Sequence, residues 1–470
     1  MKLLIISAAW LPEFWHGGKV LSPPMCLPVL AALTPRGPEI HLVDENVEPV
    51  NLQEEADLVA ISAMTASAPR AYEIADSFRA RGVPVVMGGM HPSALPEEAA
   101  QHADAVVIGE AENQWAQVLA DFAAGHPQRF YHAEERPTLT DVPLPRRDLL
   151  HQDRYLAPNL VQTARGCPHA CSFCSVSPVF GRKYRFRPVP EVIEEIRALG
   201  SRSVGFPDDN IVGRPARARE LFEALIPLRV QWAGQGDLSM AKDEELLNLM
   251  ARSGCLAMFV GIESLCAESL ATAHKQPNIG LDLEQAIATI HRHGIDLVGS
   301  FVFGLEGDKP DLFRKTVAFA ERVKLAAAQF SVLTPFPGTP IYEQFKAEGR
   351  ITSFDWSRYT MGTVVYQPHN MTGAELAAGR KYAYGHFYSL PSMARRLLVR
   401  RGTKTSWALR TAANWSYRRR LRGGKIADSL PCEDMPAPAA GGPRMHQRLC
   451  REAAKPGGTP PGGASAADLP

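Results

Sequence analysis

Hydrophobic positions in the first part of the chain follow two alternating patterns. Apolar runs of four or five residues, long enough for buried strands, occur at residues 3–7, 40–43, 58–62, 83–87 and 105–108. The stretches between them have helical spacing, most clearly residues 68–81, where Tyr72, Ala75 and Phe78 recur. Strands that alternate with amphipathic helices predict a parallel, doubly wound sheet. We therefore expect an α/β domain of Rossmann-like type over residues 1–135.

Candidate binding residues in this domain follow the third, fourth and fifth apolar runs. In doubly wound sheets, ligands bind at the carboxyl ends of the strands. Paired glycines directly after a strand also let the backbone approach a bulky ligand. The candidates at these ends are Ser62, Thr65, Gly88, Gly89, His91, Gly109 and Glu110.

A second series of strand-like and helical segments begins after residues 136–158. That segment is rich in proline and charge and predicts an exposed linker. Strands are then expected at residues 160–163, 203–206, 231–233, 257–262, 297–303 and 329–333. Helices are expected between them, at residues 190–199, 216–225, 243–253, 283–293 and 311–323. The pattern amounts to six successive βα repeats.

Length and composition narrow the class of protein. A chain of 470 residues suits two or three domains, and it has no apolar run of the roughly 18 residues that would span a bilayer. The first residues have one basic side chain and no small-residue cleavage site, which favours a strand over a secretory signal. The eight cysteines form no disulfide-like framework. We therefore expect reduced, cytoplasmic chemistry.

The strongest chemical signal is the stretch VQTARGCPHACSFCSV at residues 161–176. Cys167, Cys171 and Cys174 have the spacing C-x3-C-x2-C. Three thiolates on one short loop can bind three irons of a cubane cluster and leave the fourth iron open. A zinc site usually has four ligands, and the sequence contains no second C-x2-C pair. An iron–sulfur cluster is therefore favoured over zinc and over three cysteines close together by chance.

This stretch resembles the cluster-binding motif of the radical S-adenosylmethionine (SAM) enzymes, in which an aromatic residue such as Phe173 often precedes the third cysteine. The resemblance implies a [4Fe-4S] cluster whose open iron binds the methionine end of SAM. One-electron cleavage would then give a 5'-deoxyadenosyl radical. The resemblance to radical SAM enzymes also implies that residues 159–369 form a partial (β/α)6 TIM barrel, with the active site at the carboxyl ends of its strands.

Further candidates follow the expected barrel strands. Asp208 and Asp209, after the second strand, could bind the SAM amino group or position substrate, and a capped turn is the alternative. By resemblance, Glu263 would accept hydrogen bonds from the SAM ribose and Gly304 would contact adenine. The string TPFPGTP at residues 334–340 is similar to the end of the barrel in cobalamin-type members.

The first domain resembles the cobalamin-binding domain that precedes many radical SAM barrels. The resemblance lies in the segments PPMCLPVLAAL, GGMHPSALPEEA and VVIGEAE, and it implies that the strand-end residues named above bind cobalamin. The D-x-H-x-x-G motif, which supplies an axial histidine in some cobalamin proteins, is absent. The enzymes that this domain resembles commonly lack the motif too. The alternative is a domain that kept its shape and lost its ligand. Methylthiotransferases are disfavoured, because Cys26 is the sole cysteine in this domain.

The C-terminal part predicts a basic helical extension over residues 370–427 and a disordered, low-complexity tail over 428–470. Thr372 and Glu375 have the spacing of a capping box. Residues 376–427 contain thirteen Lys or Arg, no Asp or Glu, and several aromatic side chains. The alternatives are contact with a membrane surface or anionic partner, and docking onto the rest of the chain, which has 38 basic and 50 acidic residues. Nucleic acid is disfavoured, because no recognition motif accompanies the charge.

These resemblances together imply a cobalamin-dependent radical SAM methyltransferase that acts on an unactivated carbon of a small molecule or lipid. The extension is similar to that of hopanoid-methylase-like members, which suits a lipid substrate and a position at the inner membrane surface. One SAM would supply the radical and a second would remethylate cobalt, with flavodoxin or ferredoxin as electron donor. Two alternatives remain: cyclisation or rearrangement with the same cofactors, and a corrinoid or redox sensor whose cluster is not catalytic.

Overall fold

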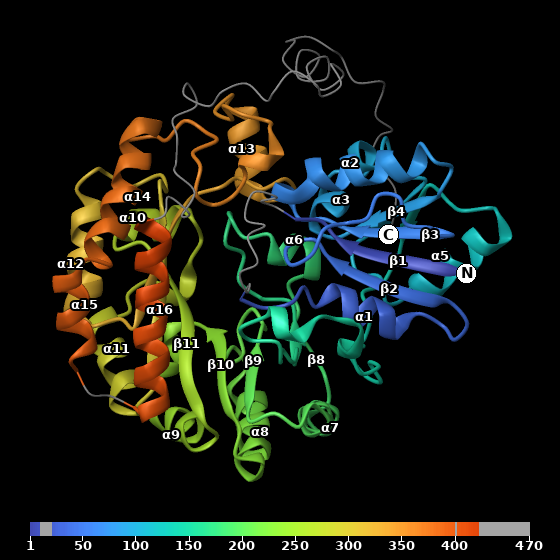
Figure 1. Ribbon diagram of the computed structural model, residues 1–470. Coiled ribbons are helices and arrows are strands. Elements are labelled where there is room, and N and C mark those ends of the chain that lie inside the picture. The colour runs from blue at the N-terminus through green and yellow to red at the C-terminus, as the bar shows by residue number, and fades with distance from the viewer. Residues whose placement is uncertain (10–20, 400–401, 423–470) are drawn as a thin grey trace, which may run out of the picture.

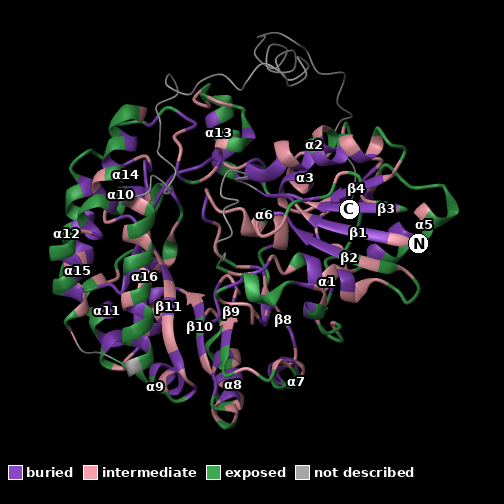
Figure 2. Ribbon diagram, in the orientation of Figure 1, coloured by how far each residue is buried: buried purple, intermediate pink, exposed green. Residues whose placement is uncertain are grey.

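The computed structural model describes residues 1–9, 21–399 and 402–422. The expected disordered tail lies outside these residues. Two α/β bodies, each built on a parallel sheet, lie side by side (Figure 1). In both bodies the strands are mostly buried or partly buried, and the exposed residues lie on the outer helices and on loops (Figure 2). The predicted α/β architecture is confirmed.

The first sheet has six parallel strands in the order β2-β1-β3-β4-β5-β6. They are β1 (Lys2–Ser7), β2 (Glu39–Asp44), β3 (Leu58–Ser62), β4 (Val85–Gly88), β5 (Ala105–Ile108) and β6 (Phe130–His132). Alternate residues of β1 enter different cores, with Leu3 and Ile5 on one face and Leu4 and Ile6 on the other. Both faces are therefore covered, as is usual for a parallel sheet. Strand β6 was not predicted, because three residues are too few to show a pattern.

Helices cover both faces of the first sheet. Those of this body are α1 (Cys26–Leu33), the 3₁₀ turn η2 (Thr65–Ser67), α2 (Ala68–Arg79), α3 (Met90–Ala94), α4 (Pro96–Ala99) and α5 (Trp115–Ala124). Leu27 of α1 and Trp115 of α5 share the core of Leu3, whereas Phe78 of α2 shares the core of Leu4. The chain leaves β1 first toward β2 and later toward β3, on its other side. The reversal opens a crevice at the carboxyl ends of these strands.

The second sheet has five parallel strands in sequence order from β9 to β13. They are β9 (Ser203–Phe206), β10 (Gln231–Gly236), β11 (Cys255–Glu263), β12 (Asp296–Phe303) and β13 (Ala327–Val332). Its helices and 3₁₀ turns are α7 (Val189–Leu199), α8 (Pro215–Leu225), η5 (Ile226–Leu228), η6 (Leu238–Lys242), α9 (Glu244–Arg252), α10 (Ala267–Thr272), η7 (Gln276–Asn278), α11 (Leu283–Arg292) and α12 (Leu312–Arg322). The predicted βα repeats of the barrel are present.

The strand predicted at residues 160–163 forms only one parallel bridge, between Leu160 and Gly205. Beyond it, the backbone N–H groups of Thr163 and Ala164 donate to the carboxylate of Asp208, and not to a neighbouring strand. A side chain thus takes over the hydrogen bonding that would have extended the strand.

Most residues of the predicted linker are exposed, and a few of its side chains are buried against the two bodies. It contains two 3₁₀ turns, η3 (Arg147–Leu149) and η4 (Gln152–Arg154). Buried Arg147 forms an ion pair with Glu195 of α7 in the barrel. The Tyr155 hydroxyl donates to Asp44 Oδ2 of the first sheet at 2.9 Å. These contacts tie both bodies to one segment.

After β13 the chain returns to the first body through α13 (Pro340–Ala347) and η8 (Trp356–Arg358). Tyr342, Trp356 and Tyr359 belong to the same core as Phe78 of α2. The indole of Trp356 also donates to Glu98 Oε1 at 2.8 Å. The segment expected to end the barrel therefore covers one face of the N-terminal sheet.

The C-terminal extension is helical, as predicted. It contains α14 (Gly373–Phe387), α15 (Leu390–Leu397) and α16 (Lys404–Arg422). Thr372 and Glu375 form the predicted capping box at the start of α14. The hydroxyls of Tyr384 and Tyr388 accept hydrogen bonds from backbone N–H groups of β13, so the extension covers an otherwise open sheet edge. Across the described ranges, no helix has both the length and the apolar character to cross a membrane.

Trp356→Ala is expected to destabilise the first body by about 3–5 kcal/mol, because it leaves a cavity in a core shared by segments far apart in sequence. Denaturant unfolding at equilibrium measures the change. Phe354→Ala, at a 37% exposed aromatic two residues away, is the matched control. Equal effects of the two substitutions would contradict the role given to Trp356.

Candidate active site

A short antiparallel ribbon closes the base of the cysteine loop. Strands β7 (Ala164–Arg165) and β8 (Arg185–Phe186) pair on either side of residues 166–184. Gly166 has a φ of +88°, and a Cβ there would collide with the carbonyl oxygen of Lys183. The next residue, Cys167, donates its N–H to Gly181 O at 3.2 Å. The loop therefore has a defined entry that only glycine permits.

The three cysteines lie together on this loop. Cys171 is buried, and Cys167 and Cys174 are partly buried. Burial raises the pKa of each thiol, and together with the charges of Cys171 and Cys167 it raises the pKa of Cys174 to about 11. Among the described residues, no three His, Cys, Asp or Glu side chains converge on a single ion. The ligands of a cluster need not do so, since each thiolate binds a different iron, and this donor set fits a cluster.

The loop is seated on the barrel by its middle residues. Ser172 donates its N–H to Ala273 O at 3.1 Å and accepts from the N–H of Ile341 at 3.0 Å. Phe173 packs against the barrel core. The helix α6 (Val176–Phe180) completes the loop. The aromatic residue before the third cysteine thus anchors the loop.

Asp208 holds the strand that leads into the loop. Its Oδ1 accepts from the N–H groups of Thr163 at 2.7 Å and Ala164 at 3.0 Å, and its Oδ2 accepts from Thr163 Oγ1 at 2.6 Å. Burial raises the pKa of Asp208 to about 6, although these hydrogen bonds act to lower it. Both carboxylate oxygens are used within the chain, so the structure gives Asp208 a positioning role and no evident contact with SAM.

Of the two neighbouring acidic residues Asp208 and Asp209, Asp209 is the one that lies near the cysteines. It is half-buried, and burial together with the charge of Asp208 raises its pKa to about 6. In turn, its charge raises the pKa of Cys167 and of Cys174. Asp209 therefore lies close to Cys167 and Cys174 in the fold.

Glu263 forms a buried ion pair beside the cysteines. It ends β11 with a φ of +65°, at an irregularity in the pairing with β12. Its Oε1 lies 2.8 Å from Lys275 Nζ. Burial alone would lower the pKa of Lys275, but the charges of Glu263 and Cys171 raise it above its ordinary value. A Cβ at Gly261 would collide with the Glu263 carboxylate, which explains the glycine two positions earlier.

Sequence reasoning missed Asp237 and His169. Asp237 follows β10 and accepts from Asn210 Nδ2 at 2.6 Å, while His169 Nε2 of the cysteine loop lies 3.8 Å from Asp237 Oδ2. Although burial opposes it, hydrogen bonds from His169, Ser239 and Asn210 hold the pKa of Asp237 below its ordinary range. Its place directly after a strand was the available signal, but the strand was expected to end at residue 233.

Gly304 lies against the C-terminal extension. Its N–H donates to Asp308 Oδ2 at 3.0 Å, and its carbonyl accepts from the Tyr366 hydroxyl at 2.5 Å. A Cβ at this position, which has a φ of +91°, would collide with Tyr366. Both polar backbone atoms are used within the chain, so a contact with adenine would involve its Cα alone.

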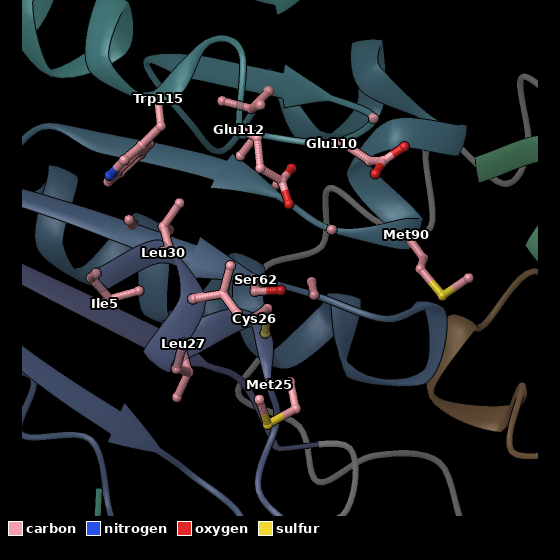
Figure 3. A pocket seen from close by; sticks show the side chains of 18 of the residues that line it. Ile5, Met25, Cys26, Leu27, Leu30, Ser62, Met90, Glu110, Glu112 and Trp115 are labelled. Carbon is pink, nitrogen blue, oxygen red and sulfur yellow. The ribbon is translucent and has the colours of Figure 1, made fainter. Parts of the chain in front are cut away.

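A pocket of about 360 Å³ opens at the carboxyl end of the first sheet (Figure 3). Of the predicted cobalamin residues, its lining includes Ser62, Gly88, Gly89, Gly109 and Glu110. Apolar side chains of α1, α5 and the sheet form the walls. No atom lies within 4 Å of a Cβ built on Gly109, whereas one on Gly89 would approach Ala63 O at 2.7 Å. An apolar slot bounded by glycines fits a large cofactor.

Thr65 and His91, also predicted to bind cobalamin, do not line this pocket. His91 is fully buried, with Nε2 3.2 Å from Glu98 Oε1 and its ring 5.2 Å from that of Trp356. Successive residues of a helix point in different directions, so in α3 Met90 takes the pocket side and His91 the interior. Met25 and Cys26, which motif reasoning did not assign, line the pocket instead.

The pocket reaches the cysteine loop. Gln162, Arg165, Val179 and Phe180 belong to its lining. Arg165 lies two residues before Cys167, and Val179 and Phe180 lie on α6. The pocket that contains most of the predicted cobalamin residues is therefore also bounded by segments on both sides of the three cysteines.

Comparisons with known proteins agree with this arrangement. The family model "B12 binding domain" matches residues 21–119, and that of the "Radical SAM superfamily" matches residues 161–320. A curated relative, bacteriochlorophyllide d C-12(1)-methyltransferase of Chlorobaculum tepidum, is 32% identical over 368 residues, which cover 76% of this chain and 80% of the relative. This chain belongs to the cobalamin-dependent radical SAM enzymes.

A further relative and a solved structure are also similar to this radical SAM enzyme. The hopanoid C-2 methylase of Rhodopseudomonas palustris is 29% identical over 71% of this chain and 66% of its own. The structure of the radical SAM methyltransferase TsrM from Kitasatospora setae, with cobalamin and a [4Fe-4S] cluster bound, has a TM-score of 0.65 at 17% identity. It covers 89% of this chain and 99% of TsrM, and at that identity the likeness concerns the fold alone.

The residues of this radical SAM enzyme fit the cofactors of its family. Cys167, Cys171 and Cys174 would supply the three thiolates of a [4Fe-4S] cluster that leaves one iron open for SAM. The glycine-bounded pocket of the first sheet suits cobalamin.

Gly166→Ala is expected to prevent normal cluster binding, since the side chain would collide with Lys183 O in a backbone conformation already costly by about 1–2 kcal/mol. Iron per chain after anaerobic reconstitution checks this. Gly385→Ala is the control, because a Cβ there meets no atom within 4 Å. Full iron content in the Gly166 variant would show that the entry geometry is not required.

Proposed function

We propose that this enzyme transfers a methyl group to an unactivated carbon of a small molecule or lipid. The observation that carries the proposal is that one pocket has lining residues from both bodies. Gly88 and Gly109 of the first sheet lie on one side of it, and Arg165 and Phe180 next to the cysteines lie on the other. A reaction that uses two cofactors on one substrate requires both to face it.

When bound, the cluster supplies one-electron cleavage of SAM, and cobalamin supplies the methyl group. The chain's own residues bind and orient these groups. Glu263, held by Lys275 beside the cysteines, would accept hydrogen bonds from the SAM ribose. Asp209, near Cys167 and Cys174, would bind the SAM amino group. Ser62 and the strand-end glycines are the cobalamin contacts.

The lining of the pocket also suits radical chemistry. Met25 and Met90 lie on the side of the first sheet, and Val179 and Phe180 on the side of the cysteine loop. Apolar side chains exclude water from a reactive intermediate without offering polar hydrogens. Methionine is flexible and adapts to substrates of different shape.

An external electron donor of flavodoxin or ferredoxin type is part of this proposal, because the cleavage of SAM consumes one electron. Pro168, next to Cys167, is exposed. The cysteine loop thus reaches the surface, where a small carrier could dock.

The methyltransferase is expected to form S-adenosylhomocysteine and 5'-deoxyadenosine in equal amounts as it transfers a deuterated methyl group from SAM to a carbon of its product. The reconstituted protein is incubated with labelled SAM, a reductant and a small-molecule and lipid extract of its own cells, and products are measured by mass spectrometry. Cys171→Ala is expected to abolish 5'-deoxyadenosine formation, whereas Cys266→Ala is the control. Formation of 5'-deoxyadenosine without S-adenosylhomocysteine would instead indicate cyclisation or rearrangement.

We also propose that the extension makes peripheral contact with an anionic membrane. Part of its charge is turned inward: Arg410 pairs with Asp296 at 3.1 Å, and Arg396 lies over the Phe387 ring at 3.6 Å. Arg380 donates to Phe330 O of β13 at 2.9 Å. These arginines attach the extension to the barrel, so the membrane contact rests on the side chains that remain outside.

The outer side of the extension combines aromatic and basic residues. Trp407 and Trp415 of α16 are 48% and 54% exposed, and Leu398 is 81% exposed. Arg419 and Arg420 are also exposed. Indole rings and basic groups on one helix suit the interface of an anionic bilayer.

The full chain is expected to sediment with phosphatidylglycerol-containing vesicles, and much less with phosphatidylcholine alone. Arg419→Glu/Arg420→Glu should weaken binding by about tenfold or more, since each basic residue near such a surface contributes about 1 kcal/mol. Glu97→Arg, a charge change on the exposed surface of the first body, is the control. Unchanged binding of the double variant would rule out this surface.

A further inference from the structure

Two arginines lie directly opposite each other in the ribbon at the base of the cysteine loop. The register of β7 and β8 pairs Arg165 with Arg185. Like charges at opposed positions of an antiparallel pair repel each other. The ribbon therefore needs a negative charge between them.

Glu110, from the loop after β5 in the other body, supplies that charge. Its Oε2 lies 2.7 Å from Arg165 Nη1, and its Oε1 lies 2.6 Å from Arg185 Nη2. Arg185 Nη1 also donates to Oε2 at 3.1 Å, which makes the second pair bidentate. One carboxylate thus binds both strands of the ribbon.

The group is buried and balanced in charge. The side chains of Glu110 and Arg165 are 3% and 10% exposed. Glu112 also pairs with Arg165, so two carboxylates face two guanidinium groups. Removing one member would leave a buried charge without its partner, which is far costlier than the loss of an exposed ion pair.

The same arginines extend the contact to neighbouring segments. Arg185 donates to Pro137 O at 2.8 Å in the linker and to Phe180 O at 3.1 Å on α6. Arg165 Nε donates to Gln162 Oε1 at 2.8 Å. Glu110 therefore sits where the first body, the linker and the cysteine loop meet.

We propose that Glu110 is a positioning residue that fixes the cysteine loop relative to the pocket of the first sheet. Its place after the fifth strand of the first sheet made it a candidate cobalamin contact, but its carboxylate is directed to the arginines. The inference rests on the proposed function in one respect: alignment of the two sites matters because a radical formed at one must meet a methyl group held at the other. Small displacements of reacting groups cost large factors in rate.

Glu110→Gln keeps the size of the side chain and removes its charge. The two arginines then repel each other, and the ribbon loosens while the three cysteines are unchanged. The expected result is uncoupling, in which the radical is still formed but less of it leads to methylated product.

The first test uses hydrogen–deuterium exchange on the full chain without cofactors. In Glu110→Gln, residues 161–186 are expected to exchange faster by roughly tenfold, with β1 to β4 unaffected. Glu97→Gln, at an exposed glutamate of the same body, should change neither region. Unchanged exchange at residues 161–186 would overturn the proposal.

Arg185→Lys provides a second variant, because it keeps the charge and loses the bidentate contact. It is expected to speed exchange in the same residues to a smaller extent. If Glu110→Gln fails to fold, this variant decides the question by the same measurement.

The second test is the ratio of 5'-deoxyadenosine to methylated product in the reconstituted enzyme. Glu110→Gln is expected to raise this ratio at least several-fold at unchanged iron content, whereas a general loss of stability would lower both products together. An unchanged ratio would overturn the positioning role. If the unaltered enzyme makes no methylated product, the proposed function fails, and the exchange experiment still decides whether Glu110 positions the loop.

Discussion

Two parallel sheets with separate cores can share one reaction space only if their carboxyl-terminal edges are held face to face. In this enzyme three connections do so. The linker contributes the buried pair of Arg147 and Glu195, the segment after β13 contributes Trp356 to the first core, and Glu110 reaches across to the ribbon. All three bury polar or aromatic groups where the two bodies meet, so the relative placement of the two sites is part of the fold.

Buried carboxylates divide into two groups by what they touch. Asp208 accepts hydrogen bonds from backbone N–H groups, and Glu110 pairs with guanidinium groups. Both sets of contacts shape the cysteine loop. Asp209 and Glu263 lie beside the cysteines, and Lys275 offsets the charge of the latter. The contacts of the first group shape the site, and the second group is the one proposed to contact SAM. Motif position alone does not separate them, because all four follow strands.

Local patterns were enough to predict the strands, most helices and the cysteine loop, since burial on both faces leaves a strong periodic signal. They failed where a contact depends on the other body. The direction of His91 follows from where α3 begins, and the return of Trp356 to Glu98 joins residues 258 positions apart. The strand at residues 160–163 was overestimated because the Asp208 side chain replaces its backbone partners. The paired arginines at Glu110 left no local pattern at all.

The edge of β13 has a consequence for how the chain is made. Its polar backbone groups are satisfied by Tyr384, Tyr388, Arg380 and Asn414, side chains that come 50 or more positions later. A ribosome therefore completes the barrel sheet well before it supplies the cover, and during that interval an unpaired strand edge is open to other nascent chains. The extension thus closes this edge only after the rest of the barrel sheet has been made.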